Sequence, residues 1–114
     1  MTELLHLTER VLWEEARAAG TYQMSTKGRT LGEVGFIHAS LRHQLPAVAR
    51  ALYGERPEPG RLVVLVIDSE RLTAPVRYEP PVPGGTDLFP HIYGSLPVGA
   101  VVDVVDVESW PGAE

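Results

Sequence analysis

The chain contains no cysteine among its 114 residues. It therefore has no disulfide framework, no thiolate nucleophile and no cysteine-based zinc site. Whatever chemistry the protein performs must be carried by histidine, hydroxyl and carboxylate groups.

Basic residues are absent from the C-terminal third. All ten Lys and Arg residues lie at or before Arg77, while acidic residues continue to Glu114, and the formal net charge is −5. A nucleic-acid-binding protein usually carries a basic surplus, so nucleic acid is not expected as a partner. An anionic ligand should meet the N-terminal two-thirds of the chain, where the positive charges lie.

Long apolar segments are also absent. The longest uninterrupted apolar run is Leu62 to Ile67, far short of the roughly 20 residues that a membrane-spanning helix needs. The chain begins Met1-Thr2-Glu3, without the basic and apolar regions of a signal peptide. We therefore expect a cytoplasmic protein without a membrane partner. Its length fits one domain over 1–114, with a core from about residue 4 to 107 and a tail over 108–114.

The first twenty residues predict a strand followed by a helix. The apolar run from Leu4 to Leu7 is typical of a strand. Thr8 is the expected N-cap of the helix, because its hydroxyl can accept a bond from a free backbone N–H. Gly20 is the expected end, since glycine readily adopts the left-handed conformation there.

Helical spacing of Leu45, Val48, Ala49 and Leu52 predicts a second helix. Pro46 complicates it, because proline fits a first turn but breaks a straight interior. Two possibilities stay open: the helix begins near residue 43, or it begins at residue 40 and bends at the proline.

The other segments predict short strands and loops. The segment 61–68 contains the continuous apolar, largely β-branched run Leu62 to Ile67, which is typical of a strand covered on both faces. One helical turn is expected at 69–72 and a loop over 80–87. Further extended segments are expected at 22–24, 35–40, 76–79 and 100–107. The sum is an α+β domain with about six short strands and two main helices.

The four histidines are His6, His38, His43 and His91. No two have the helical spacing of a metal site, so bound metal is not expected. His6 and His38 each lie near the end of an apolar strand that leads into a helix, where free backbone N–H groups often bind ligands. The alternative is that both are core histidines bonded to backbone carbonyls.

The segment over 87–94 places Phe89, His91 and Tyr93 beside a proline- and glycine-rich loop. One interpretation is a hydrophobic plug, with Phe89 and Ile92 covering the core. The other is a binding segment, in which Phe89 or Tyr93 stacks on a planar ligand and His91 hydrogen-bonds or protonates it.

Three further polar residues are candidates for the same site. Glu79 ends a predicted strand and could serve as a general base or a ribose-binding carboxylate, or as a solvated charge. Lys27 and Arg29 lie in a glycine-containing loop and could meet a phosphate, although one exposed basic pair is weak evidence.

Three blocks of sequence resemble a known family. They are Leu5-His6-Leu7-Thr8, then Gly35-Phe36-Ile37-His38-Ala39-Ser40, then Leu88-Phe89-Pro90-His91-Ile92-Tyr93-Gly94-Ser95-Leu96-Pro97. In this order they resemble the hallmark blocks of domain of unknown function family 952. The resemblance runs from Leu4 to about Val107. It implies a fold like that of ADP-ribosyltransferases, in which a split, mixed β-sheet cradles NAD.

The resemblance also implies roles for individual residues. By analogy, His6 contacts the nicotinamide ribose, Ser40 supplies a hydroxyl, and Tyr93 or Phe89 stacks on the ligand. His91 stands where a transferase usually has a glutamate, and Glu79 could replace that glutamate only if the fold brings it to the pocket.

The leading hypothesis is a domain that binds NAD or an ADP-ribose-type ligand in a histidine-lined cleft. As an enzyme it would be an NAD-utilising transferase or glycohydrolase, with NAD as substrate. The alternative is a non-enzymatic ligand- or protein-binding module that reuses the fold. The candidate catalytic residues are His6, His91 and Glu79, and the candidate ligand contacts are His38, Ser40, Phe89, Tyr93, Lys27 and Arg29.

Overall fold

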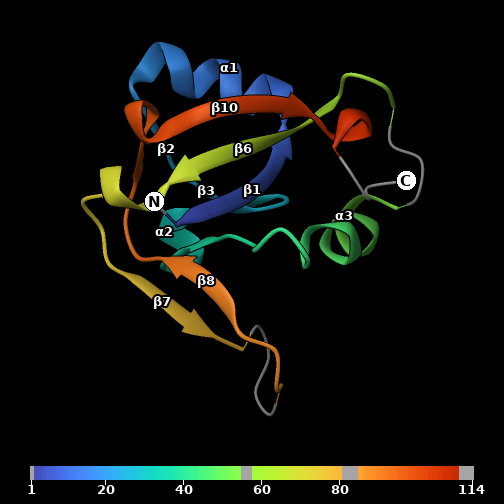
Figure 1. Cartoon of the computed structure of the whole chain (residues 1–114). Helices are drawn as coiled ribbons and strands as arrows, with labels where there is room; N and C mark the ends of the chain where they lie inside the picture. The colour runs from blue at the N-terminus through green and yellow to red at the C-terminus, as the bar shows by residue number, and fades with distance from the viewer. Residues whose placement is uncertain (1, 55–57, 81–84, 111–114) are drawn as a thin grey trace.

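The computed structural model of the chain describes residues 2–54, 58–80 and 85–110. At its centre, strand β6 (Leu62–Asp68) lies between β1 (Glu3–Glu9) and β10 (Val101–Asp106) in an antiparallel sheet (Figure 1). Every β6 residue from Leu62 to Ile67 is buried. The strand predicted from the continuous apolar run is thus confirmed, because a strand covered on both faces is apolar at every position.

Alternate side chains of β6 point to opposite faces of this sheet. One set packs in a core cluster with Trp13 of helix α1 (Arg10–Ala19). The other set packs in a second cluster with Leu45 of helix α3 (Leu45–Tyr53) and with Trp110. The central sheet therefore has one core cluster against each face.

Helix α1 ends where the sequence predicts and begins later than predicted. Gly20 terminates it in the left-handed conformation, with φ of +92°. The expected N-cap, Thr8, is wrong: β1 continues to Glu9, and Glu9 occupies the cap position without a side-chain bond. Thr8 is instead buried, and its hydroxyl bonds that of Tyr22.

The segment after α1 holds more regular structure than expected. Strands β2 (Thr21–Tyr22), β3 (Met24–Thr26) and β4 (Arg29–Thr30) precede a four-residue helix, α2 (Leu31–Val34). A capping box joins Thr30 and Glu33, and the Thr-x-x-Glu spacing was the overlooked sequence signal. The strand expected over 35–40 is only β5 (Ile37–His38).

Helix α3 resolves the alternatives that Pro46 left open. The helix begins at Leu45, so the proline lies in its first turn and no bend is needed. Its start is close to the first of the two expected positions, near residue 43.

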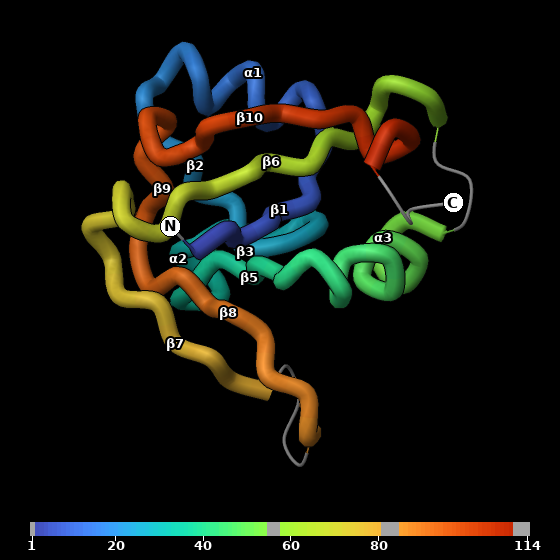
Figure 2. The backbone as a smooth tube through the Cα atoms, viewed as in Figure 1, coloured from blue at the N-terminus to red at the C-terminus, as the bar shows by residue number. Residues whose placement is uncertain are grey.

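A second sheet has the order β5-β8-β7, with β7 (Val76–Glu79) and β8 (Phe89–Ile92) forming a hairpin. This hairpin extends away from the rest of the molecule in Figures 1 and 2. The predicted strand at 76–79 is confirmed, and so is the helical turn, η1 (Ser69–Arg71). Part of the loop expected over 80–87 lies outside the described residues, at 81–84.

The α+β class is confirmed, and two details of the prediction are wrong. All strand pairings among the described residues are antiparallel, so the sheet is not mixed. The described residues form ten short strands in place of the expected six or so, because several pairs are only two or three residues long. One example is β9 (Leu96–Pro97), which pairs with β2. The two main helices expected are α1 and α3, and the described residues add the four-residue α2.

The packed structure extends further toward the C-terminus than expected. After η2 (Val98–Ala100) and β10, a turn of 3₁₀ helix, η3 (Val107–Ser109), leads to Trp110, which is only 4% exposed. The guanidinium of Arg42 lies 4.7 Å from the centroid of the Trp110 ring. The expected tail over 108–114 therefore includes buried structure, and residues 111–114 lie outside the described chain.

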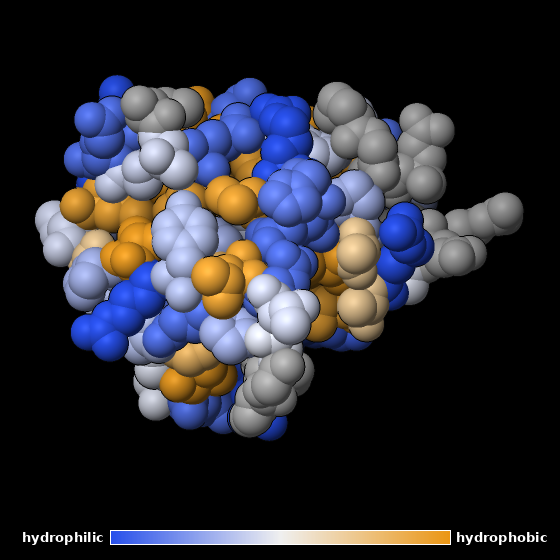
Figure 3. All heavy atoms as spheres, turned by 60° about the horizontal axis from the view of Figure 1, so that its bottom comes forward, coloured by the Kyte–Doolittle hydropathy of each residue, from blue (hydrophilic) through white to orange (hydrophobic). Residues whose placement is uncertain are grey.

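Apolar and charged side chains alternate over the face in Figure 3, where hydrophobic groups form small separate patches. Within the described ranges, no helix is long and apolar enough to cross a membrane.

Candidate functional site

The β5-β8-β7 sheet brings four polar side chains to one face. His38 of β5 pairs with His91 of β8, and His91 pairs with Arg77 of β7. Directly paired residues point to the same face of a sheet, as do residues two positions along a strand. Glu79 and Phe89, which pair with each other, therefore share this face.

His91 and Tyr93 both hydrogen-bond to Glu79, and we call these three residues the Glu79 cluster. The Tyr93 hydroxyl donates to Glu79 Oε1 at 2.5 Å, and Nδ1 of His91 lies 2.9 Å from the same oxygen. Both bonds, that from Tyr93 first, lower the pKa of Glu79. An ionised carboxylate only accepts hydrogen bonds, so the His91 proton that faces Glu79 is on Nδ1.

This arrangement leaves the other nitrogen of His91 without a partner. The ring is only 2% exposed, and no described residue hydrogen-bonds Nε2. Phe36 stacks on the ring, with centroids 4.1 Å apart and planes 18° apart. In neutral His91 with its proton on Nδ1, Nε2 carries a lone pair that can accept a proton or a hydrogen bond.

His38 adjoins the Glu79 cluster through His91. Its ring meets His91 edge-on, with centroids 5.0 Å apart, and it also contacts Phe36. Burial, and then the neighbouring His91, lower the pKa of His38 below the usual value of 6.5. Neutral His38 can both donate and accept a hydrogen bond.

His6 is part of a separate buried chain of hydrogen bonds. Its Nδ1 lies 2.5 Å from the carbonyl oxygen of His38, and its Nε2 lies 2.7 Å from the Tyr22 hydroxyl. Burial lowers the pKa of His6 to about 4, so the ring is neutral at physiological pH. Nδ1 must therefore donate to the carbonyl, and Nε2 accepts from Tyr22. The Tyr22 oxygen is 2.7 Å from that of Thr8, which can supply the remaining proton.

A pocket of about 350 Å³ opens beside His38. We call it the His38 pocket. Its walls come from β3, from the segment that follows β5, from α3 and from the start of β8. Its lining includes His38, Ser40, Phe89, Thr26, Val48 and Leu52.

Lys27 lies close to this pocket. Its Nζ donates to the carbonyl of Leu52 at 2.9 Å and lies 4.9 Å from the centroid of the Tyr53 ring. Leu52 lines the pocket, so the ammonium group stands at its edge. Arg29 is exposed on β4 and does not line the pocket.

The predicted residues thus fall into three groups. His38, Ser40 and Phe89 line one pocket, with Lys27 at its edge. Glu79, His91 and Tyr93 form the Glu79 cluster, which adjoins His38 but does not line the pocket. His6 is behind both, only 3% exposed, and Arg29 lies apart from them.

Two residues of this region were not singled out from the sequence. Phe36 stacks on His91, and the Arg77 guanidinium lies 5.0 Å from the centroid of the Tyr93 ring. Phe36 is two positions before His38, and Arg77 is two positions before Glu79. The two-residue period of a strand, applied to either candidate, could have identified them.

Among the described residues, no group of three or more histidine, aspartate or glutamate side chains could hold a metal ion.

The fold and this region define an antiparallel α+β protein with a histidine–carboxylate cluster next to a small pocket. The family described as "Protein of unknown function (DUF952)" matches residues 7–104, and the chain belongs to it. The resemblance carried by the three sequence blocks is thereby confirmed. A search of curated proteins finds no match.

Solved structures of protein CC0527 from Caulobacter crescentus are similar to this chain. The crystal structure is 28% identical, with a TM-score of 0.75, over 92% of this chain and 85% of that one. The solution NMR structure is 30% identical, with a TM-score of 0.69, over 93% of this chain and 84% of that one.

Proposed function

We propose that the chain binds NAD or an ADP-ribose-type nucleotide in the His38 pocket. One observation carries the proposal: three residues expected from the sequence to contact such a ligand, His38, Ser40 and Phe89, line the same pocket. Its volume of about 350 Å³ is at the lower end of the range for small-molecule sites. The pocket would therefore hold one part of the ligand, and the rest would extend past Lys27.

The chemistry of the lining supports a nucleotide. Phe89 and the aliphatic groups of α3 provide a surface for a planar base. The hydroxyls of Ser40 and Thr26 and the neutral ring of His38 can exchange hydrogen bonds with ribose hydroxyls. Lys27 offers a positive charge to the pyrophosphate.

The proposed nucleotide site also bears on how the fold is interpreted. Two separate three-stranded sheets, β1-β6-β10 and β5-β8-β7, support interpretation of the chain as a variant of the ADP-ribosyltransferase fold. The His38 pocket would then correspond to part of its NAD cleft. The cysteine-free composition agrees with the cytoplasmic location expected from the sequence.

If the protein processes NAD, the Glu79 cluster is the source of its acid–base chemistry. In hydrolysis, the water oxygen bonds C1′ of the ribose as the C1′–N bond breaks. The electron pair of that bond goes to the pyridinium nitrogen, which leaves as neutral nicotinamide. Nε2 of His91 would take the proton of the water, while Glu79 holds Nδ1–H and stabilises the imidazolium.

The non-enzymatic alternative is favoured by a specific observation. His91 is 2% exposed and does not line the His38 pocket, so this chemistry requires the site to open. A module that binds the nucleotide through His38, Ser40 and Phe89 needs no such opening.

An NMR titration tests binding. With NAD or ADP-ribose, we expect the His38 ring and the amides of Ala39, Ser40 and Phe89 to shift. The variant His38→Ala should weaken binding, whereas His43→Ala, at an exposed histidine outside the pocket, should not. If none of these signals moves at millimolar ligand, the proposal is wrong.

Two comparisons refine the result. Lys27→Gln should weaken binding of ADP-ribose more than Arg29→Gln, because only Lys27 stands at the edge of the pocket. Nicotinamide release by the wild type, but not by Glu79→Gln, would identify an enzyme. Binding without release would identify the module.

A further inference from the structure

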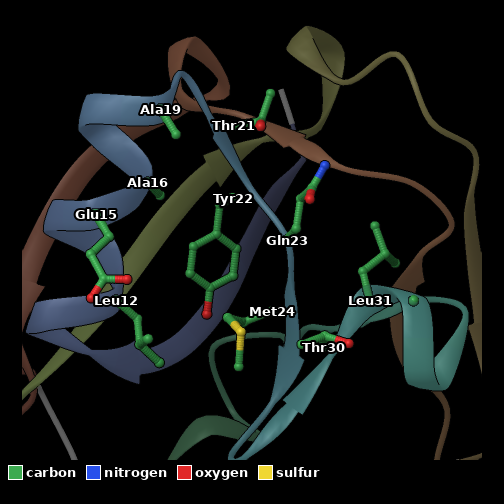
Figure 4. A pocket seen from close by; sticks show the side chains of 11 residues that line it. Leu12, Glu15, Ala16, Ala19, Thr21, Tyr22, Gln23, Met24, Thr30 and Leu31 are labelled. Carbon is green, nitrogen blue, oxygen red and sulfur yellow. The ribbon is translucent and has the colours of Figure 1, made fainter.

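The chain has a second and larger cavity, which we call the α1 pocket. It measures about 620 Å³ and lies between α1, the β2–β3 segment and the start of α2. Figure 4 shows the side chains of Leu12, Glu15, Tyr22, Met24 and Leu31 around this space. None of the residues proposed above for the nucleotide lines it.

The α1 pocket has a mostly apolar lining with one charge. Leu12, Met24 and Leu31 contribute aliphatic and thioether surface, and Tyr22 contributes an aromatic ring. Glu15 is the only charged residue among the described residues of the lining. The nearby Arg17 bonds Glu14 at 3.3 Å instead, and no described basic side chain pairs with Glu15.

Hydrogen bonds hold Tyr22, which lines this pocket, in one position. Tyr22 is only 2% exposed, and its hydroxyl is fixed by bonds to His6 and Thr8. Met24 also lines the pocket, and its thioether is a favourable neighbour for an aromatic ring. The lining around Tyr22 therefore needs little ordering when a ligand binds, which reduces the entropic cost.

We propose that the α1 pocket is a second ligand site, for a small planar molecule that carries a positive charge. The ring of the ligand packs on the partly exposed side chains of Leu12, Met24 and Leu31, and its ammonium group faces Glu15. No described basic side chain pairs with the Glu15 carboxylate, and none lines the pocket. The pocket therefore favours a positively charged ligand over an anion. The site is separate from the proposed nucleotide site, because the two linings share no residue.

Tryptamine is a suitable probe, because it joins a planar ring to an ammonium group. In an NMR titration of the full chain, the amides of Glu15, Tyr22, Gln23 and Leu31 should shift. Indole-3-acetate has the same ring with a negative charge and should bind at least about tenfold more weakly.

Matched variants test the role of the carboxylate. Glu15→Gln should weaken tryptamine about threefold, as expected for an exposed charge pair. Glu14→Gln, one position away and outside the lining, should leave the affinity within twofold.

Three results would overturn the proposal. The first is equal binding of tryptamine and indole-3-acetate, and the second is no shift at millimolar tryptamine. The third is a shift of the same α1-pocket amides by NAD, because the cavity would then belong to the nucleotide site. Failure of NAD to bind anywhere, with tryptamine still bound at Glu15, would reject the nucleotide function and leave this site intact.

Discussion

Nδ1 of His6 donates a hydrogen bond to the carbonyl oxygen of His38, with 2.5 Å between the two atoms. This bond joins β1 of the central sheet to β5 of the second sheet. Two backbone bonds between Leu5 and Ser40, of 2.9 and 2.7 Å, flank it. His6 therefore holds the strand that carries His38 to the pocket, and under the proposed function it acts on the ligand through His38.

The first prediction concerns the stability of the fold below neutral pH. The pKa of His6 is about 4 in the folded chain and near 6.5 when unfolded. The unfolded chain thus binds more protons between these values, so stability is complete above pH 6.5 and falls as the pH drops toward 4. At pH 4.5, His6 should account for a loss of about 2–3 kcal/mol in the free energy of unfolding.

Urea unfolding of the wild type and His6→Gln measures this loss. The difference in stability between the two chains should narrow by about 2 kcal/mol from pH 7 to 4.5. If His6→Gln does not fold, the His6 ring signal of the wild type can be titrated by NMR. A His6 that protonates near pH 6.5 in the folded chain would contradict the prediction.

The second prediction concerns the hydroxyl of Tyr22. Tyr22→Phe keeps the ring but removes the partner of His6 Nε2 and of Thr8. Because these hydrogen bonds are buried, we expect Tyr22→Phe to lose about 1–3 kcal/mol in unfolding free energy. Tyr78→Phe is the matched control: Tyr78 is 45% exposed, and its change should stay within about 0.5 kcal/mol. Equal effects of the two variants would show that the buried bonds do not matter.

The sequence predicted those elements whose burial or end point follows from a local residue pattern. The continuous apolar run of β6 indicated a strand covered on both faces, and Gly20 marked the end of α1. The short β2, β3 and β4 were missed or merged, because two- and three-residue strands carry no periodic signal. Strand direction was also missed, since it depends on which distant segments pair.

In the candidate site, too, contacts between residues close in the sequence could be predicted, and contacts between distant segments could not. His38 and Ser40 could be placed near one another, because they are two residues apart in the chain. The bond between Glu79 and His91 depends on the register of β7 and β8 across a long loop. No local pattern contains that register, so the sequence left open whether Glu79 reaches the site. The alternative stated for His6, a core histidine bonded to a backbone carbonyl, is confirmed, but the sequence could not name its partners, because Tyr22 and the His38 carbonyl come from other segments.

The third prediction explains the glycine in the Phe89–Gly94 block. A Cβ added to Gly94 would lie 2.7 Å from the Cβ of Ala74, too close for two carbon atoms. Gly94→Ala should therefore cost about 1–3 kcal/mol in unfolding free energy. Gly99→Ala, where nothing lies within 4 Å, should change stability by no more than about 0.5 kcal/mol.

A double variant separates this contact from a general intolerance of alanine. Ala74→Gly removes the opposing Cβ, so Gly94→Ala combined with Ala74→Gly should be more stable than the sum of the single losses predicts. Strict additivity of the two losses in thermal or urea unfolding would rule out the clash as the cause.

The fourth prediction concerns the Glu79 cluster in acid. The pKa of Glu79 is lowered in the folded chain by the bonds from Tyr93 and His91. Ionised Glu79 therefore contributes stability that is complete above pH 4.5, its ordinary pKa, and is lost as the pH falls through the folded value. Below pH 4.5, the unfolding free energy of Glu79→Gln should fall less steeply with pH than that of the wild type. Asp87→Asn, at an exposed carboxylate, should keep the wild-type profile.

The proton on Nδ1 of His91 provides a second readout, because ¹⁵N shifts distinguish the two tautomers. An Nε2-protonated ring in the wild type at pH 7 would mean that Glu79 does not orient His91, and the acid–base role would lose its basis.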